Sequence, residues 1–297
     1  MPAFFTHYAF CVKNYRSLKD SSLKKMIKEH KNAYALGAIG PDIFFYYMPD
    51  CRLKDKSPGS LMHEKHTQLF FENILKRAEI MPKKKQKIAY AYIAGFIGHY
   101  ELDVNCHPFV YEETDSEIPS LKMAQHYELE GAMDVYSSYE YLHRLPTELK
   151  QRELIRISKE ERKVISTLLA DAYCATYRTS KQTRLRMVMI LKAMRAVIFL
   201  LKDKRGIKER VWTRAEKLFA GHAVLGPLFI NNNTYSYTVE DWYVFHKYFC
   251  KGVKAYQSII PYYEKYVVKK GDKRKSRKEL LEKIGNDSYH AGKVIAL

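Results

Sequence analysis

Apolar residues recur along the chain mostly at the spacing of one helix face, and the densest apolar run is Ile88–Ile97. A helix that is apolar on all sides is buried, so we predict a central helix over Lys83–Asp103. Pro108 should then stop or kink it. Alternation with period two, which would indicate strands, is hard to find. The pattern therefore predicts an all-α protein.

Capping residues and glycines divide the rest of the chain into further helices. Ser21 or Ser22 can cap one of them and Gly37 can end it. The remaining predicted helices cover residues 3–14, 23–36, 61–77, 121–142, 159–177, 184–204, 209–222 and 239–256. We therefore expect a single multi-helix domain over residues 1–267 and a basic C-terminal tail over 268–297.

The composition agrees with a globular helical protein. The chain has 297 residues, of which 46% are apolar and 28% charged, and this is enough to form a full core. The number of cysteines is odd and no C-x-x-C is present, so we expect no disulfides and a reducing compartment. The five cysteines are Cys11, Cys51, Cys106, Cys174 and Cys250.

We find no sign of export or membrane insertion in the sequence. Residues 1–7 lack a basic region followed by an apolar run, so a signal peptide is not expected. The most apolar segment, Leu185–Leu201, contains Arg186, Lys192 and Arg195 and is too charged for a membrane span. We expect a cytoplasmic protein that is soluble or peripheral to a membrane.

Positive charge is concentrated in the second half of the chain. Residues 1–149 hold 19 basic and 19 acidic side chains, whereas residues 150–297 hold 32 and 14 and so carry the whole net charge of +18. Such a field attracts anionic partners such as nucleic acid, a phospholipid surface or phosphate esters. The alternative is a solvated basic exterior that keeps the protein soluble.

Candidate metal ligands occur at helical spacing between residues 99 and 130. His99, Asp103 and His107 are four residues apart, and so are His126 and Glu130. Residues four apart project from the same helix face, and imidazole with carboxylate is a donor set that zinc takes from helices. The alternative is a polar helix face on which this spacing arises by chance. Three donors at successive steps of four, followed by a second pair at the same spacing, favour a metal site.

Three further candidates precede this stretch, and each lies at or beside a predicted helix end. They are His7, Asp42 and His63. Eight donors exceed the needs of one zinc ion and suit a multinuclear site of the kind that activates water against phosphorus.

Other motifs give no competing site. Glycine-rich nucleotide loops and G-x-S-x-G are missing, and His63-Glu64-x-His66 is not H-E-x-x-H because Thr67 follows. His66 is interpreted as a structural residue or as support for a ligand. The isolated histidines His222, His246 and His290 are interpreted as surface or structural residues.

The donor order His, Asp, His, His-x3-Asp, His, His-x3-Glu resembles the zinc-dependent phospholipase C family, whose fold is shared by single-strand-specific zinc nucleases. Three segments are similar to its intracellular bacterial branch: Pro-Ala-Phe-Phe-Thr-His-Tyr-Ala-Phe at 2–10, Gly-Pro-Asp-Ile-Phe-Phe-Tyr-Tyr at 40–47 and Gly-His-Tyr-x-x-Asp-x-Asn-x-His-Pro at 98–108. The resemblance covers residues 2 to about 135, and it implies a single all-α domain of that type.

The resemblance implies two to three zinc ions and a role for each donor. The implied ligand sets are Asp42, His63, His99 and Asp103 for one ion, His107, His126 and Glu130 for another, and His7, bridging Asp103 and the N-terminal amine for the third. Asp42 would also be the general base or the group that orients the attacking water. Family members that are secreted present Trp at the mature N-terminus, whereas here removal of Met1 would expose Pro2.

These residues imply a metal-dependent phosphodiester hydrolase that acts on phospholipids through water activated at zinc. The aromatic side chains of Phe44, Phe45, Tyr46 and Tyr47 can hold a quaternary ammonium headgroup or pack in the core. The basic second half, including residues 150–267, can dock on an anionic membrane. The alternatives are a single-strand nuclease that uses the same metals and an idle, zinc-stabilised scaffold or membrane-binding protein.

Overall fold

The structure, a computed structural model, describes residues 4–51, 57–114, 116–221, 223–268 and 271–290. These residues form helices and loops with no strand, and Lys202 and Ile230 make an isolated β-bridge. The prediction of an all-α fold is confirmed.

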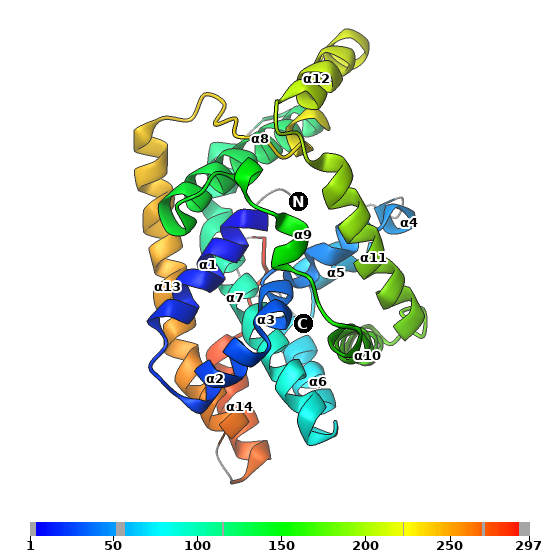
Figure 1. Cartoon of the computed structure of the whole chain (residues 1–297), viewed down its shortest axis with the longest axis vertical. Helices are drawn as coiled ribbons and strands as arrows, with labels where there is room; N and C mark the ends of the chain where they lie inside the picture. Colours follow the sequence, from blue (N-terminus) through cyan, green and yellow to red (C-terminus); the bar gives the residue numbers. More distant parts are fainter. Residues whose placement is uncertain (1–3, 52–56, 115, 222, 269–270, 291–297) are drawn as a thin grey trace.

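The helices are labelled as in Figure 1. The α-helices are α1 (Phe4–Ser17), α2 (Ser22–Glu29), α3 (Lys31–Gly37), α4 (Met48–Cys51), α5 (Pro58–Glu64), α6 (Thr67–Glu79), α7 (Lys83–Glu113), α8 (Pro119–Ser137), α9 (Gln151–Leu154), α10 (Lys159–Tyr177), α11 (Arg184–Leu201), α12 (Ile207–Ala220), α13 (Val239–Val268) and α14 (Lys273–Ile284). The short helical segments are η1 (Gly40–Tyr46), η3 (Ser138–Leu142), η4 (Pro146–Glu148) and η5 (Gly226–Leu228).

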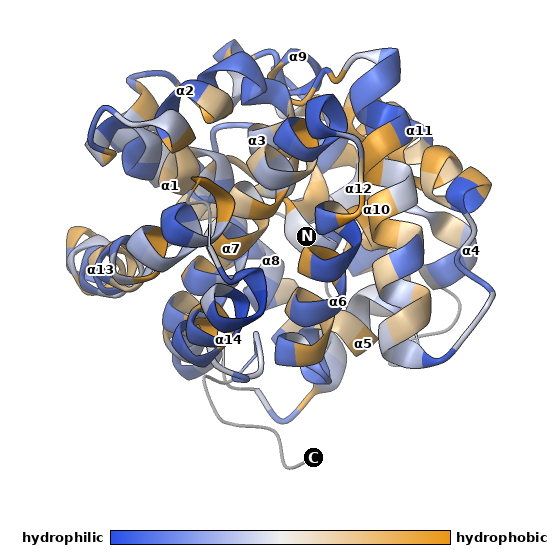
Figure 2. Cartoon of the chain, turned by 90° about the horizontal axis from the view of Figure 1, so that it is seen from below, coloured by the Kyte–Doolittle hydropathy of each residue, from blue (hydrophilic) through white to orange (hydrophobic). Residues whose placement is uncertain are grey.

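Helix α7 lies at the middle of the fold, as its apolar sequence predicts. Residues 88–97 are all buried. Helices α3 and α13 pack along α7, and α1, α6 and α10 cover other parts of its surface. Figure 2, which shows the molecule from below, colours the helices around α7 by hydropathy, and each carries apolar residues among polar ones. Burial of each large apolar side chain stabilises this arrangement by about 1.5–3 kcal/mol.

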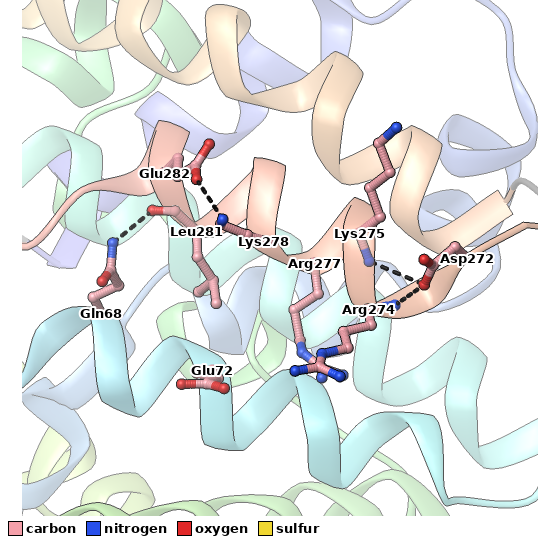
Figure 3. A pocket seen from close by; sticks show the side chains of 9 residues that line it. All are labelled: Gln68, Glu72, Asp272, Arg274, Lys275, Arg277, Lys278, Leu281 and Glu282. Atoms are coloured by element: carbon pink, nitrogen blue, oxygen red, sulfur yellow. Dashed lines mark hydrogen bonds and ion pairs between the residues drawn. The ribbon is translucent and has the colours of Figure 1, made fainter.

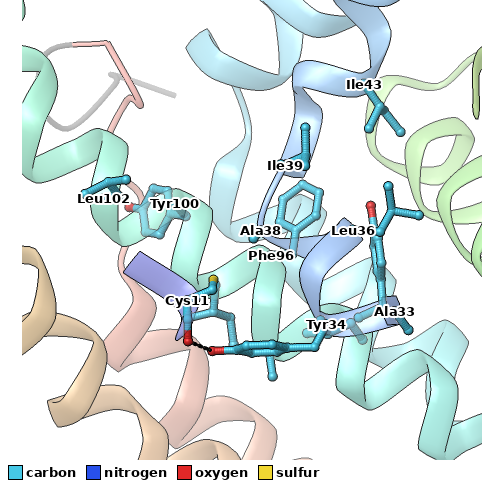
Figure 4. Packing of buried hydrophobic residues seen from close by; sticks show 14 of the residues in the cluster. Cys11, Ala33, Tyr34, Leu36, Ala38, Ile39, Ile43, Phe96, Tyr100 and Leu102 are labelled. Carbon is cyan, nitrogen blue, oxygen red and sulfur yellow. Dashed lines mark hydrogen bonds between the residues drawn. The ribbon is translucent and has the colours of Figure 1, made fainter. Parts of the chain in front are cut away.

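Helix α3 crosses α7 at a pair of glycines, Gly37 and Gly95. A methyl group on Gly37 would lie 2.0 Å from the carbonyl oxygen of Tyr92, and one on Gly95 would lie 2.0 Å from that of Tyr34. The two backbones are therefore in contact, and η1, which follows α3, is brought against α7. Figure 4 shows the apolar side chains at this crossing, with Phe96 among them.

Proline does not end the central helix. Pro108 lies inside α7, which continues to Glu113. A proline removes one helical hydrogen bond, but the next two residues, Phe109 and Val110, are buried and hold the following turn in the core. As a result, His99, Asp103 and His107 lie on one continuous helix.

Several predicted helix ends differ from the observed ones. The single helix expected over 61–77 is two helices, because His66 between them has a left-handed φ of 63°. The helix expected over 23–36 is likewise interrupted, at His30. Ser21 caps α2, and Ser158 caps α10 through a reciprocal bond with Glu161, as expected.

The segment predicted as a basic tail contains a packed helix. Helix α14 lies against α13 and α6. Gln68 Nε2 donates to the Leu281 carbonyl oxygen at 3.0 Å, and Arg277 pairs with Glu79 at 2.6 Å. Figure 3 shows the first of these contacts in the groove between α14 and α6, which several basic side chains of α14 line. Residues 286–290, called the C-terminal strap below, follow α14.

Helix α12 stands away from the helices around α7, at the end of the molecule where α8 lies (Figure 1). Its side chains Leu218 and Phe219 are 80% and 87% exposed. None of the described helices is both long and apolar enough to cross a bilayer. The four cysteine side chains that the structure describes, Cys11, Cys106, Cys174 and Cys250, are free thiols.

Candidate metal centre

Five imidazole and carboxylate side chains from four elements meet beside the middle of α7. They form the first donor group, which comprises His7 of α1, Asp42 of η1, His63 of α5, and His99 and Asp103 of α7. Asp103 Oδ1 lies 3.2 Å from Nε2 of His7. Its Oδ2 lies 3.0 Å from Nε2 of His99 and 3.7 Å from Nε2 of His63. Asp42 Oδ1 lies 3.2 Å from Nε2 of His63.

The hydrogen bonds of the His63 and His99 rings show which ring nitrogen turns its lone pair toward the carboxylates. Nδ1 of His63 lies 2.8 Å from the Gly59 carbonyl oxygen, and Nδ1 of His99 lies 3.0 Å from that of Ala38. A carbonyl only accepts, so each Nδ1 carries a proton and Nε2 of the neutral ring is unprotonated. Nε2 of His99 is buried without a hydrogen-bond partner, although it lies 3.0 Å from Asp103. A neutral Nε2 and a carboxylate oxygen repel each other unless a proton or a metal ion lies between them, and this donor set fits zinc.

Electrostatics favour ionised carboxylates in the first donor group. Burial raises the pKa of Asp103, but the imidazoles of His99 and His107 outweigh burial and hold this pKa well below its usual value. Burial also raises the pKa of Asp42, but when the rings of His99 and His63 are protonated, the charge of His99 and a hydrogen bond from His63 bring this pKa below its usual value. Ionised carboxylates are the form that binds metal.

Gly40 allows Asp42 and His99 to approach each other. Its φ is 49°, in the left-handed region that favours glycine, and a methyl group on it would lie 2.4 Å from the His99 ring. Pro41 then begins η1 with Asp42 in its first turn. The Gly-Pro-Asp sequence therefore both turns the chain and leaves room for the ring.

A second donor group contains His107 of α7 and His126 and Glu130 of α8, with donor atoms within 4.8 Å of one another. Nε2 of His126 lies 3.0 Å from Oε1 of Glu130. Nδ1 of His107 donates to the Tyr289 carbonyl oxygen at 2.5 Å, so its Nε2 is also unprotonated in the neutral ring. Burial raises the pKa of Glu130, but nearby positive charge, including that of His126, brings it below its usual value.

One cavity of about 390 Å³ joins the two donor groups. Donor side chains of both groups line it, together with the start of α8 and residues from η1, α7 and the C-terminal strap. The other lining side chains include Phe45, Tyr111, Lys122, Met123, Tyr127 and His290. A substrate in this cavity would therefore contact both candidate metal sites at once.

Comparison with known families shows the family of this chain. The family model described as zinc dependent phospholipase C matches residues 5–182, which is more than half of the chain and includes all eight predicted donors. The chain belongs to the zinc-dependent phospholipase C family. Neither the curated proteins nor the solved structures include a significant match. The resemblance predicted from the donor order is thus confirmed at the level of the family, and the intracellular bacterial branch stays a prediction.

The structure brings together all eight side chains that the family resemblance implies. In three sets, one donor atom from each residue lies within 4.8 Å of the donor atoms of the others: Asp42, His63 and His99; His7, His99 and Asp103; and His107, His126 and Glu130. Their assignment to individual zinc ions stays a prediction. The N-terminal amine, at Pro2 after removal of Met1, lies outside the described residues.

The aromatic residues after Asp42 divide between the core and the cavity. Phe44 and Tyr46 are buried in the core, and Tyr47 lies beneath the Arg186 guanidinium. Phe45, by contrast, lines the cavity. The reason is the 3₁₀ geometry of η1, in which residues three apart share a face, so that Phe45 follows Asp42.

The remaining histidines have different surroundings. His66 is exposed between α5 and α6, and Nδ1 of His246 lies 2.9 Å from the Tyr141 hydroxyl. His222 lies outside the described residues. The interpretation of His290 as a surface or structural residue missed its position in the cavity wall, because no local spacing links it to the donors.

Asp134 is a further residue that sequence reasoning missed. Its Oδ1 accepts from the backbone N–H of Thr6 at 2.7 Å and from the Thr6 hydroxyl at 2.8 Å. Asp134 lies one turn beyond Glu130 on α8, so this helix also fixes the start of α1 and thereby places His7. In the sequence, Asp134 follows Glu130 by four residues, and this helical spacing could have indicated that both lie on the same face of the helix.

Proposed function

We propose that this protein hydrolyses phosphodiesters with zinc and that its substrates are phospholipids. The observation that carries the proposal is the convergence of two donor groups on one cavity, in a chain of the zinc-dependent phospholipase C family. Neighbouring metal sites suit in-line displacement at phosphorus, because one clamp stabilises both the attacking and the leaving oxygens.

The residues around the cavity would have different roles in the reaction. The first donor group would hold one or two zinc ions through Asp42, Asp103 and three imidazoles, and the second group would hold another. Bound zinc supplies Lewis-acid chemistry and lowers the pKa of water. Asp42, ionised and in the cavity wall, would orient the attacking water or accept its proton. Phe45, beside it, would contact the headgroup.

The surface near the cavity favours a lipid substrate. Met123 lines the cavity and is exposed, and Ile118 just before α8 is exposed as well. Helix α12, at the same end, presents Leu218 and Phe219 to solvent together with lysine and arginine side chains. Exposed apolar residues among basic ones suit the interface of an anionic membrane, where each basic residue contributes about 1 kcal/mol.

Substrate assays on zinc-loaded protein test the function directly. Release of phosphocholine from phosphatidylcholine vesicles would support the proposal, whereas cleavage of single-stranded DNA alone would support a nuclease that stacks bases on the cavity aromatics. If wild type hydrolysed neither, while His99→Ala lost zinc and thermal stability, the protein would be an idle zinc-stabilised scaffold. Elemental analysis with less than about one zinc per chain would contradict every version of the site.

Vesicle binding tests the membrane surface separately. Phe219→Ser should weaken binding to vesicles that contain phosphatidylserine several-fold, because an exposed aromatic side chain leaves the interface. Ile80→Ser is the matched control, since Ile80 is 73% exposed at the end of α6 and away from α12. Equal binding of the two variants would exclude α12 as the docking surface. Hydrolysis of a soluble phosphodiester should be the same in both.

A further inference from the structure

The C-terminal strap, residues 286–290, lies outside the residues that the family match covers, yet it reaches the cavity. Its first residue, Asn286, accepts through Oδ1 from the backbone N–H of Gln68 at 3.1 Å. The next residue, Asp287, donates its N–H to the Tyr100 hydroxyl at 3.0 Å. The strap is thus bonded to α6 and α7 before it reaches the donors.

Tyr289 connects the strap to both donor groups. Its ring is buried, with its centroid 5.0 Å from the ring of His63 and 4.9 Å from that of Tyr100. Its N–H donates to the His63 carbonyl oxygen at 3.0 Å, and its own carbonyl oxygen accepts from Nδ1 of His107. A carbonyl that accepts from Nδ1 fixes the tautomer and the direction of a metal-binding histidine. For His107 this partner comes from the far end of the chain.

His290 adds an imidazole to the seven predicted donor side chains that line the cavity. Its ring centroid lies 5.4 Å from that of His63 and 5.8 Å from that of His107, so it stands between the two groups. Its Nδ1 lies 2.7 Å from the Tyr111 hydroxyl, and its backbone N–H donates to Ser288. If Tyr111 donates to Nδ1, Nε2 carries the proton and is the donor that remains for a ligand in the cavity.

We propose that the C-terminal strap is a working part of the metal centre. In this inference, which rests on the proposed zinc-dependent hydrolysis, Tyr289 is a positioning residue that holds His107 as a ligand, and His290 donates a hydrogen bond to a phosphate oxygen of the bound phosphodiester. The strap's bonds to three helices argue against a plug that leaves the cavity, because every one of them would have to break.

Zinc content tests Tyr289 without any need for turnover. Full-length Tyr289→Ala should retain about one zinc fewer per chain than wild type after dialysis, because loss of the buried ring frees the strap and with it the backbone carbonyl oxygen that orients His107. Tyr289→Phe keeps the ring that anchors the strap and should retain all the zinc. In a His126→Ala background, which already lacks this ion, Tyr289→Ala should cause no further loss.

Folding is checked by circular dichroism. If Tyr289→Ala does not fold, Tyr289→Leu, which fills part of the space, replaces it in the comparison. Full zinc content in a folded Tyr289→Ala or Tyr289→Leu variant would overturn the positioning role. This result would not affect the proposed function, which depends on zinc in wild type.

Hydrolysis and phosphate binding test His290. His290→Ala should keep its zinc but lose about 10–100-fold in kcat/KM and bind inorganic phosphate more weakly, whereas His290→Gln, which keeps an N–H donor, should recover part of both. Lys65→Ala, at an exposed residue between α5 and α6, is the control and should match wild type.

The two failures are distinguishable. Unchanged or increased activity in His290→Ala would overturn its role, and an increase would identify the strap as an inhibitory plug. Wild type that binds zinc but hydrolyses no phosphodiester would overturn the proposed function instead. The measurements of zinc content and of inorganic phosphate binding would then still test the roles proposed for Tyr289 and His290.

Discussion

The two donor groups use the same chemistry but are held in different ways. In the first group the ring of His99 is fully buried, and carbonyl groups of Gly59 and Ala38 orient two of the imidazoles. In the second group the side chain of His126 is 20% exposed, and the orienting carbonyl belongs to Tyr289. The first group is therefore secured by the core, whereas the second depends on a long-range contact with the C-terminal strap.

This difference indicates separate demands on the two sites. A group enclosed by the core holds its ligands in place even without metal, and its loss should damage folding. The second group, whose His126 side chain is partly exposed, can exchange metal or water more easily because solvent reaches it.

Removal of Asp103 should have the largest effect. Asp103 faces three imidazoles, so Asp103→Ala should abolish zinc binding in the first group and lower kcat/KM by more than about 10³-fold. Zinc analysis and a phosphodiester assay measure both effects. Asp171→Ala, at an exposed carboxylate of α10, is the control. Retention of all zinc by Asp103→Ala would remove the first group from the proposed site.

A methyl group on Gly40 should disrupt the first group from the backbone. Gly40→Ala places Cβ 2.4 Å from the His99 ring in addition to left-handed strain, so we expect a loss of about 3 kcal/mol or more in unfolding free energy. Gly221→Ala is the matched control: its φ is 77° but it has open space, so only about 1 kcal/mol should be lost. Urea unfolding measures both. Equal losses would mean that the ring can move aside.

Chelation should separate the two groups in time. A chelator should remove zinc in two phases, with the more exposed second group first, and thermal stability should fall mainly in the slow phase. In His126→Ala the fast phase should be missing. A single phase in both proteins would mean that the two groups do not differ in protection.

Asp134, which links α8 to α1, should make the stability of the protein depend on pH. Burial raises the pKa of its carboxyl to about 7, although hydrogen bonds from Thr6 and Phe5 lower it in part. The folded protein then holds this proton more tightly than the unfolded chain, so its contribution to stability is complete below pH 3.8 and is lost as the pH rises through about 7.

The neutral variant Asp134→Asn tests this sign. Measured by urea unfolding of metal-free protein, its stability relative to wild type should rise by about 3–4 kcal/mol between pH 4 and pH 8. This rise between pH 4 and pH 8 would be missing if the Asp134 carboxyl of wild type were already ionised at pH 4. Asp134→Ala serves for comparison, since it should be less stable than Asp134→Asn at every pH because the bonds to Thr6 are lost.

Sequence reasoning reached the local parts of this site and missed the distant ones. His99 with Asp103, and His126 with Glu130, follow from helical spacing alone, because four residues bring side chains to one face. The all-α fold and the central helix followed from the apolar pattern. The family resemblance supplied the grouping of the other donors, which spacing left open.

The contacts that sequence could not give are long-range. Nothing near Tyr289 signals that its carbonyl oxygen would meet His107, because the contact depends on how α14 packs. The same is true of Asp134 and Thr6. Phe45 was one of four aromatic candidates after Asp42, and recognition of η1 as a 3₁₀ helix would have distinguished it from the other three.

Because α7 runs unbroken through both donor groups, it acts as a ruler for the site. A helix rises 1.5 Å per residue, so four residues set Asp103 and His107 about 6 Å apart along the axis. One residue inserted between them would turn His107 by about 100° and carry it away from α8. A deletion or insertion there should therefore damage the site far more than one in a surface loop. The number of residues between Asp103 and His107 is thus fixed by the site.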